Sequence, residues 1–459
     1  MMYDFIVVGS GSGGGSLAYY LNKSGAKVLL IEAGRIYRKD TFPKTEAETS
    51  AHLYWGGGIE FAKDGRMGFL RTKMVGGSSI VYQCLMDRFD DIALNDWKQE
   101  SGVDWFTPEI MSAHYDQVES DIALHTFVPE ERNGNGKLFI KGCEKHNYKW
   151  DYLRRGQSDC AVDRGNDCIG CLGGCFRDSK QSSLVAFVQK AEKEGLEIIP
   201  DTEILKVEPN ADSCKIHGYQ NGKKVSFEGK KVILSGGAFG TTRMMTLSGF
   251  KSKLPAIGKK FSSHPQFMWL GFQNEIVDAH KGSFQTVASK DSNFRKQGFK
   301  LENVFASPIS IGMLMNEDGV EHQRLMKQYR YMQCIEVAVR DENVGEIMCD
   351  NKGKLTVSKP LTDQDKKRRD LGHQAIENIL SASGAREIYK SKFYFGLHLM
   401  GGCVMGTDAS KSVVNPDFQV HGEKNLYIVD SSIYPNAPGI NPGLTIKTLG
   451  HRLATQLTK

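Results

Sequence analysis

The chain has 459 residues, 40% of them hydrophobic and 25% charged, and its formal net charge is +5. This composition is typical of a globular protein long enough for two domains, and it excludes the disordered and low-complexity classes. Charges of both signs are mixed, and no apolar stretch reaches the roughly 18 residues of a membrane span. Neither nucleic-acid binding nor a transmembrane segment is therefore predicted.

The first predicted elements form a nucleotide-binding unit. Residues 3–9 (YDFIVVG) predict a buried parallel strand, and residues 16–23 predict the helix after it. Gly9 permits the tight turn between them, Gly11 lets a pyrophosphate approach the backbone, and Gly14 lets helix and strand pack closely. No basic segment precedes the strand, so no secretory signal is expected and a cytoplasmic protein is predicted.

The next predicted strand, residues 27–31, ends at Glu32. This acid follows the glycines by about twenty residues, where a carboxylate can bind ribose hydroxyls. The succession of strand, glycine turn, helix, strand and acid predicts a Rossmann-type dinucleotide site, but it does not distinguish NAD from FAD.

Much further along, the basic run at residues 366–369 follows Thr362 and Asp365. A threonine followed three residues later by an acid is a helix-start pattern. The run therefore predicts the solvated face of a long helix rather than a nucleic-acid site.

Several segments together resemble one known family. They are residues 75–79 (VGGSS), 231–240 (KVILSGGAFG), 398–406 (HLMGGCVMG), 425–430 (NLYIVD) and 438–445 (PGINPGLT). In order and spacing they resemble the glucose–methanol–choline (GMC) oxidoreductases, nearest to the cholesterol oxidase and long-chain alcohol oxidising branches. The resemblance implies an FAD enzyme with an α/β fold, in which a Rossmann-type FAD domain stands beside a discontinuous α+β substrate domain with an antiparallel sheet.

The resemblance also implies how the chain is divided. Both domains are expected to be discontinuous, with the active site where they meet. The FAD-binding domain is predicted at residues 1–90, 184–262 and 398–459, and the substrate domain at residues 91–183 and 263–397.

A set of cofactor-binding residues follows from the glycine motif and the family segments. Non-covalent FAD is expected, because Ile80 and Val81 stand where some members carry the histidine that attaches the flavin. Tyr82 replaces an asparagine that many members place beside the flavin. The predicted FAD-binding residues are Gly9, Gly11, Gly14, Glu32, Gly77, Ser78, Ile204, Gly236, Asp430, Pro442 and Thr445.

The expected reaction needs a base for the hydroxyl proton of an alcohol while its hydride passes to flavin N5. His398 matches the family's active-site histidine and is the predicted base, because a neutral imidazole can accept a proton. Asn441 occupies the partner position and is expected to orient the substrate oxygen. Glu336 is a weaker candidate for an auxiliary carboxylate.

The predicted function is oxidation of the CH–OH group of a small-molecule alcohol. Electrons are expected to pass to an external acceptor, such as a quinone or an electron-transfer protein. An oxidase that uses O2 is the nearest alternative, and a non-redox flavin lyase is an alternative from a different class, since fold alone does not fix function.

Four of the ten cysteines, Cys160, Cys168, Cys171 and Cys175, cluster in one segment. Their spacing lacks the second pair of a typical zinc site, whereas a disulfide or buried thiols would simply hold the loop. An iron–sulfur cluster, carried by some sugar-oxidising GMC members, would take Cys168, Cys171 and Cys175 as thiolate ligands, with Cys160 as a fourth. Disulfide or free thiols are preferred to the cluster.

Overall fold

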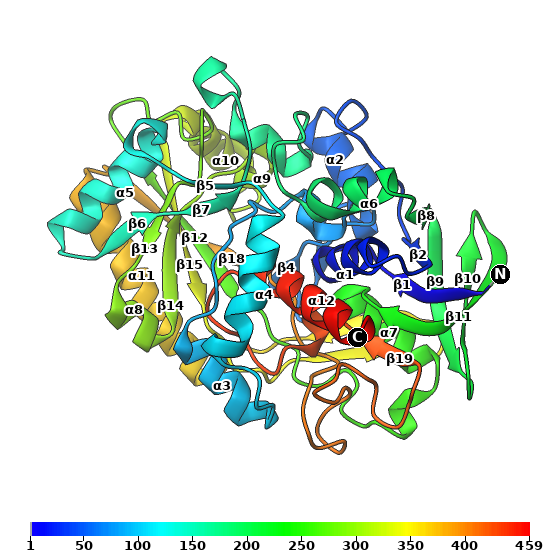
Figure 1. Cartoon of the computed structure of the whole chain (residues 1–459). Coiled ribbons are helices and arrows are strands. Elements are labelled where there is room, and N and C mark those ends of the chain that lie inside the picture. Colours follow the sequence, from blue (N-terminus) through cyan, green and yellow to red (C-terminus); the bar gives the residue numbers. More distant parts are fainter. Residues whose placement is uncertain (1) are drawn as a thin grey trace.

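Two large β-sheets organise the chain in the computed structural model, which describes residues 2–459 (Figure 1). The first sheet runs in the order β8-β2-β1-β11-β10-β9, and β19 also pairs with β11. Its strands are β1 (Tyr3–Val8), β2 (Val28–Ile31), β8 (Glu197–Ile199), β9 (Thr202–Pro209), β10 (Cys214–Gln220), β11 (Lys223–Leu234) and β19 (Leu426–Ile428).

The long strand β11 joins two kinds of pairing in this sheet. Its first half pairs antiparallel with β10, and its second half pairs parallel with β1 on one side and β19 on the other. Parallel strands buried on both faces need continuous apolar sequence, and the side chains of Ile6, Val7 and residues 29–31 are fully buried. The strand, turn and second strand predicted at residues 3–31 are therefore confirmed.

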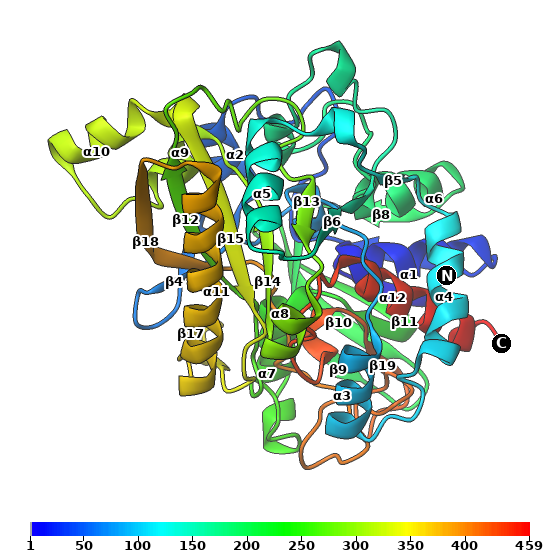
Figure 2. The same ribbon diagram turned by 90° about the vertical axis from the view of Figure 1, so that its left-hand side faces the viewer.

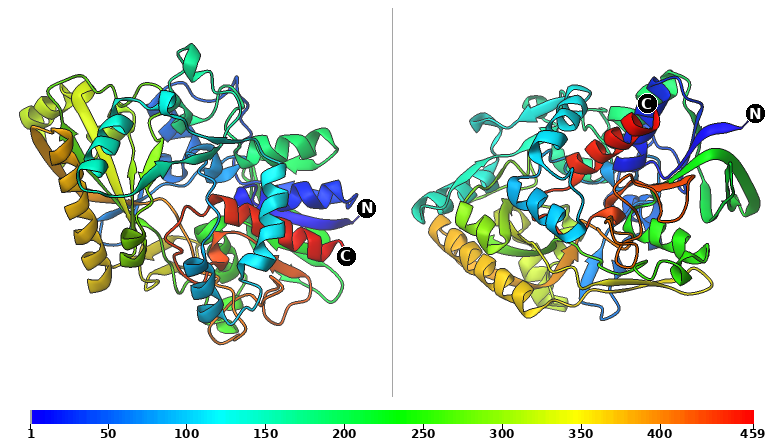
Figure 3. Two further views of the ribbon diagram at one scale, coloured as in Figure 1. Left: turned by 60° about the vertical axis from the view of Figure 1, so that its left-hand side comes forward. Right: turned by 60° about the horizontal axis from the view of Figure 1, so that its bottom comes forward.

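Helices α1 (Ser12–Lys23) and α12 (Gly443–Leu457) pack against each other beside this sheet (Figures 1 and 3). Their approach is close because Gly450 faces α1: a Cβ atom on Gly450 would lie 2.3 Å from Ser16 Oγ. Helix α1, near the beginning of the sequence, and helix α12, near its end, therefore pack together in one layer beside the first sheet.

The second sheet has the order β3-β4-β18-β12-β15-β14-β13-β6, and helices α5 and α11 pack together beside it (Figure 2). All its pairings are antiparallel except that of β4 with β18. Its strands are β3 (Glu60–Phe61), β4 (Met67–Phe69), β6 (Trp150–Tyr152), β12 (Pro265–Phe272), β13 (Val287–Ser289), β14 (Phe299–Asn303), β15 (Met332–Val339) and β18 (Glu387–Gly396); the helices are α5 (Gly134–Lys145) and α11 (Asp363–Ser383).

The remaining elements surround the two sheets. Strand β5 (Leu124–Thr126) pairs with β7 (Arg154–Gly156), and β16 (Glu346–Cys349) pairs with β17 (Leu355–Ser358). The other α-helices are α2 (Glu46–Leu53), α3 (Asp91–Ser101), α4 (Pro108–Ser120), α6 (Gln189–Lys193), α7 (Gly237–Leu247), α8 (Ser292–Gln297), α9 (Pro308–Gly312) and α10 (Gly319–Met326).

The structure departs from the predicted division at two places. Trp97 and Tyr115, on α3 and α4, are buried in the core of the first sheet, whereas the sequence assigns them to the substrate domain. Strands β3 and β4 belong to the second sheet, although their residues fall in the predicted FAD domain. In both cases apolar side chains bury against the nearer sheet, which chain order alone does not reveal.

Helix α11 is the long helix predicted after Thr362. Its first turn is closed by a capping box, in which Asp365 N donates to Thr362 Oγ1 (3.1 Å) and Thr362 N donates to Asp365 Oδ2 (2.8 Å). Across residues 2–459, no helix combines the length and the apolar character that crossing a membrane requires.

Candidate active site

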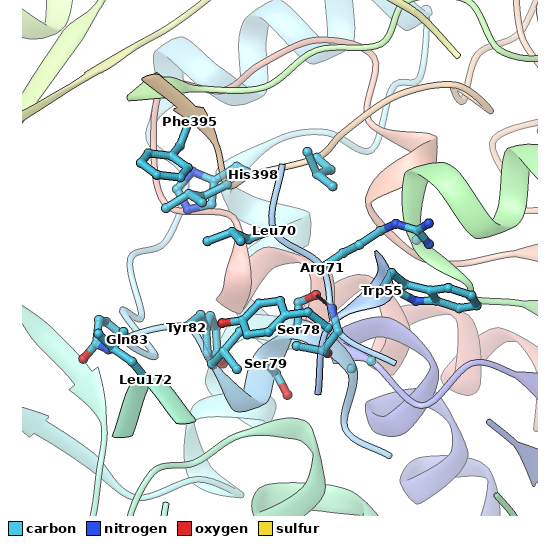
Figure 4. A pocket seen from close by; sticks show the side chains of 18 of the residues that line it. Trp55, Leu70, Arg71, Ser78, Ser79, Tyr82, Gln83, Leu172, Phe395 and His398 are labelled. Carbon is cyan, nitrogen blue, oxygen red and sulfur yellow. Dashed lines mark hydrogen bonds between the residues drawn. The ribbon is translucent and has the colours of Figure 1, made fainter. Parts of the chain in front are cut away.

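A cavity of about 590 Å³ lies between the two sheets and takes side chains from both. Its nucleotide end is lined by the glycine turn after β1, and its other end by residues of the second sheet and of the loop after β18. Figure 4 shows His398 and Phe395 across the cavity from Ser78 and Tyr82. The cavity is therefore where the two sheets jointly present their functional side chains.

The glycine turn is shaped for a ligand that approaches the backbone. Gly9 has a φ of +104°, which L side chains rarely adopt, and a Cβ on Gly14 would lie 1.9 Å from the Gly9 carbonyl oxygen. A Cβ on Gly11, by contrast, would meet no atom within 4 Å, and Gly11 lines the cavity. Gly14 thus serves packing, while Gly11 leaves open space for a phosphate.

Glu32 lies at the end of β2 and lines the same end of the cavity. Its carboxylate accepts hydrogen bonds from Ser10 N (3.0 Å), Ser10 Oγ (2.7 Å) and Gly34 N (3.1 Å). Burial nevertheless raises the pKa of this carboxyl. These bonds hold Glu32 rigidly at the position predicted for ribose recognition.

Most of the remaining predicted FAD residues also line the cavity. They are Gly77, Ser78, Ile204, Gly236, Asp430 and Pro442. Asp430 follows β19 and accepts hydrogen bonds from Gly237 N (2.8 Å) and Thr241 Oγ1 (2.6 Å), so it also fixes the start of α7. The loop at Gly77 lies against the glycine turn, since a Cβ on Gly77 would lie 2.9 Å from Gly11 Cα.

Thr445 is not brought to the cavity wall, although the sequence predicts it among the FAD residues. Its side chain is fully buried, and its hydroxyl lies 2.6 Å from Tyr115 Oη. The cavity wall is formed here by Asn441 and Pro442, which precede α12, and by Gly443 and Ile446 in its first turn. Successive helical residues point about 100° apart, so Thr445 faces Tyr115 on α4 while Ile446, the next residue, faces the cavity.

His398 follows β18 and lies partly buried beside a second histidine that the sequence did not single out. His398 Nδ1 lies 2.9 Å from His264 Nδ1, while His264 Nε2 accepts a hydrogen bond from Gly439 N (2.9 Å). Because Gly439 can only donate, the proton of neutral His264 lies on Nδ1 and is donated to His398 Nδ1. His398 then carries its own proton on Nε2, the nitrogen left for the cavity.

The electrostatic surroundings keep both rings neutral. Burial, helped by the Lys300 ammonium, lowers the pKa of His398 to about 4. Burial also holds the pKa of His264 well below its ordinary value. Near neutral pH, His398 therefore presents an uncharged N–H donor.

Asn441 is oriented by a buried lysine. Its Oδ1 accepts a hydrogen bond from Lys300 Nζ (2.8 Å), and Lys300 also pairs with Glu302 (2.6 Å) and Asp87 (3.4 Å). Because the lysine occupies the amide oxygen, the NH2 group of Asn441 is left for a ligand in the cavity. The predicted pair, His398 and Asn441, thus offers two donors there.

Glu336 on β15 is the acidic group at this end of the cavity. It is cross-strand from Glu302 and accepts hydrogen bonds from Gln266 Nε2 (3.3 and 3.4 Å). Burial, followed by repulsion from Glu302, raises the pKa of Glu336 to about 8. A carboxyl group with a pKa near the working pH is suited to proton transfer.

The cysteine loop (residues 160–175) forms part of the cavity wall through Ile169, Gly170, Leu172 and Gly173. All of its cysteines are buried free thiols. Within residues 2–459 there is no group of three or more His, Cys, Asp or Glu side chains arranged to hold a metal ion. The ligand set predicted for an iron–sulfur cluster is therefore not supported.

The cavity that reaches from the glycine turn to the second sheet, the open backbone at Gly11 and the anchored carboxylate of Glu32 fit a dinucleotide, which is typical of a nucleotide-dependent enzyme. Family models described as GMC oxidoreductase match residues 50–266 and 313–450, and one described as an NAD(P)-binding Rossmann-like domain matches residues 7–62. The chain belongs to the GMC oxidoreductase family and is an FAD-dependent oxidoreductase. The predicted family and fold class are confirmed.

Individual relatives agree with this assignment. A long-chain-alcohol oxidase of Arabidopsis thaliana is 25% identical over 99% of this chain and 67% of its own length. A cholesterol oxidase of Acinetobacter baumannii is 23% identical over 98% of this chain and 93% of its own. The crystal structure of a pyridoxine 4-oxidase from Mesorbium loti has the same fold, with a TM-score of 0.76 at 14% identity, covering 99% of both chains.

Proposed function

We propose that this protein oxidises the CH–OH group of an apolar alcohol by hydride transfer. The observation that carries the proposal is the placement of His398, Asn441 and Glu336 around one cavity whose other end is the nucleotide site. FAD supplies the hydride acceptor, its N5 atom, when it is bound. The predicted FAD residues that line the cavity would hold it.

The rest of the wall suggests the kind of alcohol. Around the polar trio the second sheet and its loops contribute mainly apolar side chains, among them Met268, Phe284, Val304, Phe305, Ile311, Leu314, Phe395 and Leu397. Such a wall favours a long-chain or sterol alcohol over a sugar, whose hydroxyls would lose hydration without partners. The names of the long-chain-alcohol and cholesterol oxidases point in the same direction.

In the proposed reaction the chain handles the hydroxyl proton. His398 Nε2–H and the Asn441 NH2 group hold the substrate oxygen and stabilise the negative charge that grows on it. Glu336, when ionised, takes the proton. His398, which the sequence predicts as the base, is the second candidate for the proton acceptor. The two candidates predict different dependences of the reaction rate on pH.

The electrons are proposed to leave to an external acceptor, a quinone or an electron-transfer protein. O2 is the second candidate acceptor, favoured by the oxidase names of the relatives. Reoxidation of the reduced protein by quinones and by O2, with peroxide measured, separates the two.

FAD is proposed to be bound without a covalent link, because Ile80 and Val81 offer the flavin no nucleophile. Precipitation with acid should release intact FAD into the supernatant. A flavin that stays with the precipitated chain would contradict this.

The central experiment is anaerobic bleaching of the yellow protein with fatty alcohols, sterols, aromatic alcohols and sugars. We expect bleaching by the apolar alcohols and none by sugars. If no alcohol bleaches the flavin, the oxidation itself is refuted and the non-redox lyase remains.

A further inference from the structure

His264 joins the two segments that bring the substrate-binding donors to the cavity. It directly precedes β12, is 2% exposed, and does not itself line the cavity. Its Nδ1 lies 2.9 Å from His398 Nδ1, and its Nε2 accepts a hydrogen bond of 2.9 Å from Gly439 N. Gly439 stands two residues before Asn441, so one buried ring contacts both the His398 ring and the loop that carries Asn441.

The loop of residues 435–441 depends on side chains for its position. Within residues 2–459, no backbone–backbone hydrogen bond holds any residue of this loop. Its carbonyl oxygens instead accept hydrogen bonds from side chains of other segments, namely Trp97, Arg340 and Asn343. The bond from Gly439 N to His264 is the contact of this kind nearest to Asn441 in the chain. Loss of His264 would therefore release the end of the loop at which Asn441 stands.

The two hydrogen bonds of His264 fix where the protons lie. A backbone N–H can only donate, so His264 Nε2 holds a lone pair and the proton of the neutral ring is on Nδ1. His398 Nδ1 accepts this proton in a hydrogen bond, and the proton of neutral His398 is then on Nε2. The opposite tautomer of His398 would place two N–H groups against each other, with their nitrogens 2.9 Å apart and no acceptor between them.

The surroundings oppose a second proton on His264. Burial, followed by the neighbouring His398 ring and three nearby cations, holds the pKa of His264 well below its ordinary value. These cations are Arg295, Arg340 and Lys300, and their carboxylate partners are Asp90, Asp96 and Glu302. The pair of rings also cannot conduct a proton away from the cavity, because it ends at the Gly439 N–H, which has no lone pair to receive one.

We propose that His264 is a positioning residue, which holds His398 as an N–H donor and, through Gly439, holds the loop that carries Asn441. The inference rests on the proposed function and deepens it. With His264 in place, His398 Nε2 has no lone pair for the hydroxyl proton, so the proton passes to Glu336. Gly439 suits this contact, since its φ of +72° and the 2.4 Å between a Cβ there and an Arg295 nitrogen both require glycine.

The direction of the hydrogen bonds is tested by NMR on the holoenzyme labelled with ¹⁵N-histidine, near neutral pH. The chemical shift of a ring nitrogen distinguishes a protonated from an unprotonated atom. We expect His264 to carry its proton on Nδ1 alone and His398 on Nε2 alone, with the signals assigned by their loss in His264→Gln and His398→Ala. A proton on His264 Nε2 or on His398 Nδ1 would overturn the proposal.

Two substitutions test the positioning itself, with an alcohol that bleaches the native flavin. His264→Leu removes both hydrogen bonds, and the limiting anaerobic rate of flavin reduction should fall about 10²-fold, the cost of a small displacement of the reacting groups. His264→Gln should stay within about tenfold of the native rate, because its amide oxygen can accept from Gly439 N and its NH2 group can donate to His398. FAD content should be unchanged in both.

A second histidine pair provides a matched control. His114 Nδ1 lies 3.0 Å from His451 Nδ1, and neither ring lines the cavity, so His114→Leu should reduce its flavin at the native rate. A native rate in His264→Leu, or a loss in His264→Gln as large as that in His264→Leu, would overturn the proposal. A native enzyme that no alcohol bleaches would instead refute the proposed function. The NMR signals decide the proton positions even if His264→Leu fails to fold.

Discussion

The two ends of the cavity are built in opposite ways. At the nucleotide end, the residues proposed to hold FAD are mostly glycines of the backbone turns, together with the carboxylates of Glu32 and Asp430, which hydrogen bonds within the chain already hold. At the substrate end, ionisable groups come from distant segments: His398 lies beside His264, Lys300 pairs with Glu302, and Glu336 is cross-strand from Glu302. Cofactor binding and substrate chemistry are therefore expected to depend on different residues. Substitutions at one end of the cavity should change one of the two and leave the other unchanged.

The largest effect is expected from His398→Ala. The anaerobic rate of flavin reduction should fall by about 10²–10⁴-fold, the usual contribution of a group that acts in proton transfer or charge stabilisation. FAD content should not change, because the nucleotide end is untouched. His421→Ala is the control, since this ring bonds Ser412 and does not line the cavity. A near-normal rate in His398→Ala would refute the assignment.

The converse substitution is Gly11→Val. Its side chain would enter open cavity, so the apoprotein should keep its Tm while FAD affinity falls about 5- to 150-fold, the effect of 1–3 kcal/mol of overpacking. Titration of apoprotein with FAD measures this. In contrast, Gly14→Ala places a methyl group 1.9 Å from the Gly9 carbonyl and should lower the Tm itself. If the two variants changed Tm and FAD affinity in the same way, the separate roles of Gly11 in FAD binding and Gly14 in packing would be contradicted.

The pH dependence of flavin reduction distinguishes the two proton acceptors. A base must be deprotonated to work, so with Glu336 as acceptor the rate should rise about tenfold per pH unit up to its pKa of about 8. With His398 as acceptor, whose pKa is about 4, the rate should already be level above about pH 5. Glu336→Gln should abolish the rise near pH 8 if that carboxylate is the base.

The smallest effect is expected from Asn441→Ala. This change removes one hydrogen bond to the substrate oxygen, so the rate of reduction should fall about two- to tenfold. Lys300 keeps its partner Glu302, and FAD content should be unaffected. A loss as large as that of His398→Ala would show that Asn441 does more than orient the oxygen.

The nucleotide end could be predicted from sequence because its main residues lie close together along the chain. Gly9 and Gly11 lie in the turn after β1, Gly14 lies at the start of α1, and Glu32 directly follows the neighbouring strand β2. Their spacing along the chain therefore predicts their arrangement in space. Thr445 was misplaced because a helix start does not reveal which side of the helix faces the cavity. The residues of that turn that line the cavity are Gly443 and Ile446.

The substrate end was predicted only in part, through His398, Asn441 and the weaker candidate Glu336. His264 precedes β12, 134 residues before His398, and no spacing rule joins them. Such contacts follow from tertiary packing, which a single sequence does not display.

The packing of α12 against α1 also affects when FAD can bind during synthesis of the chain. Residues 426–457 add β19 to the first sheet and supply the helix that packs on α1, and they are synthesised after every other strand of the two large sheets. A growing chain thus has its glycine turn long before it has Asn441 or the cover over that turn. We expect FAD to be retained only by chains that include these residues. Stalled nascent chains that end before residue 426 should not retain it, which makes cofactor loading a check on the synthesis of this segment.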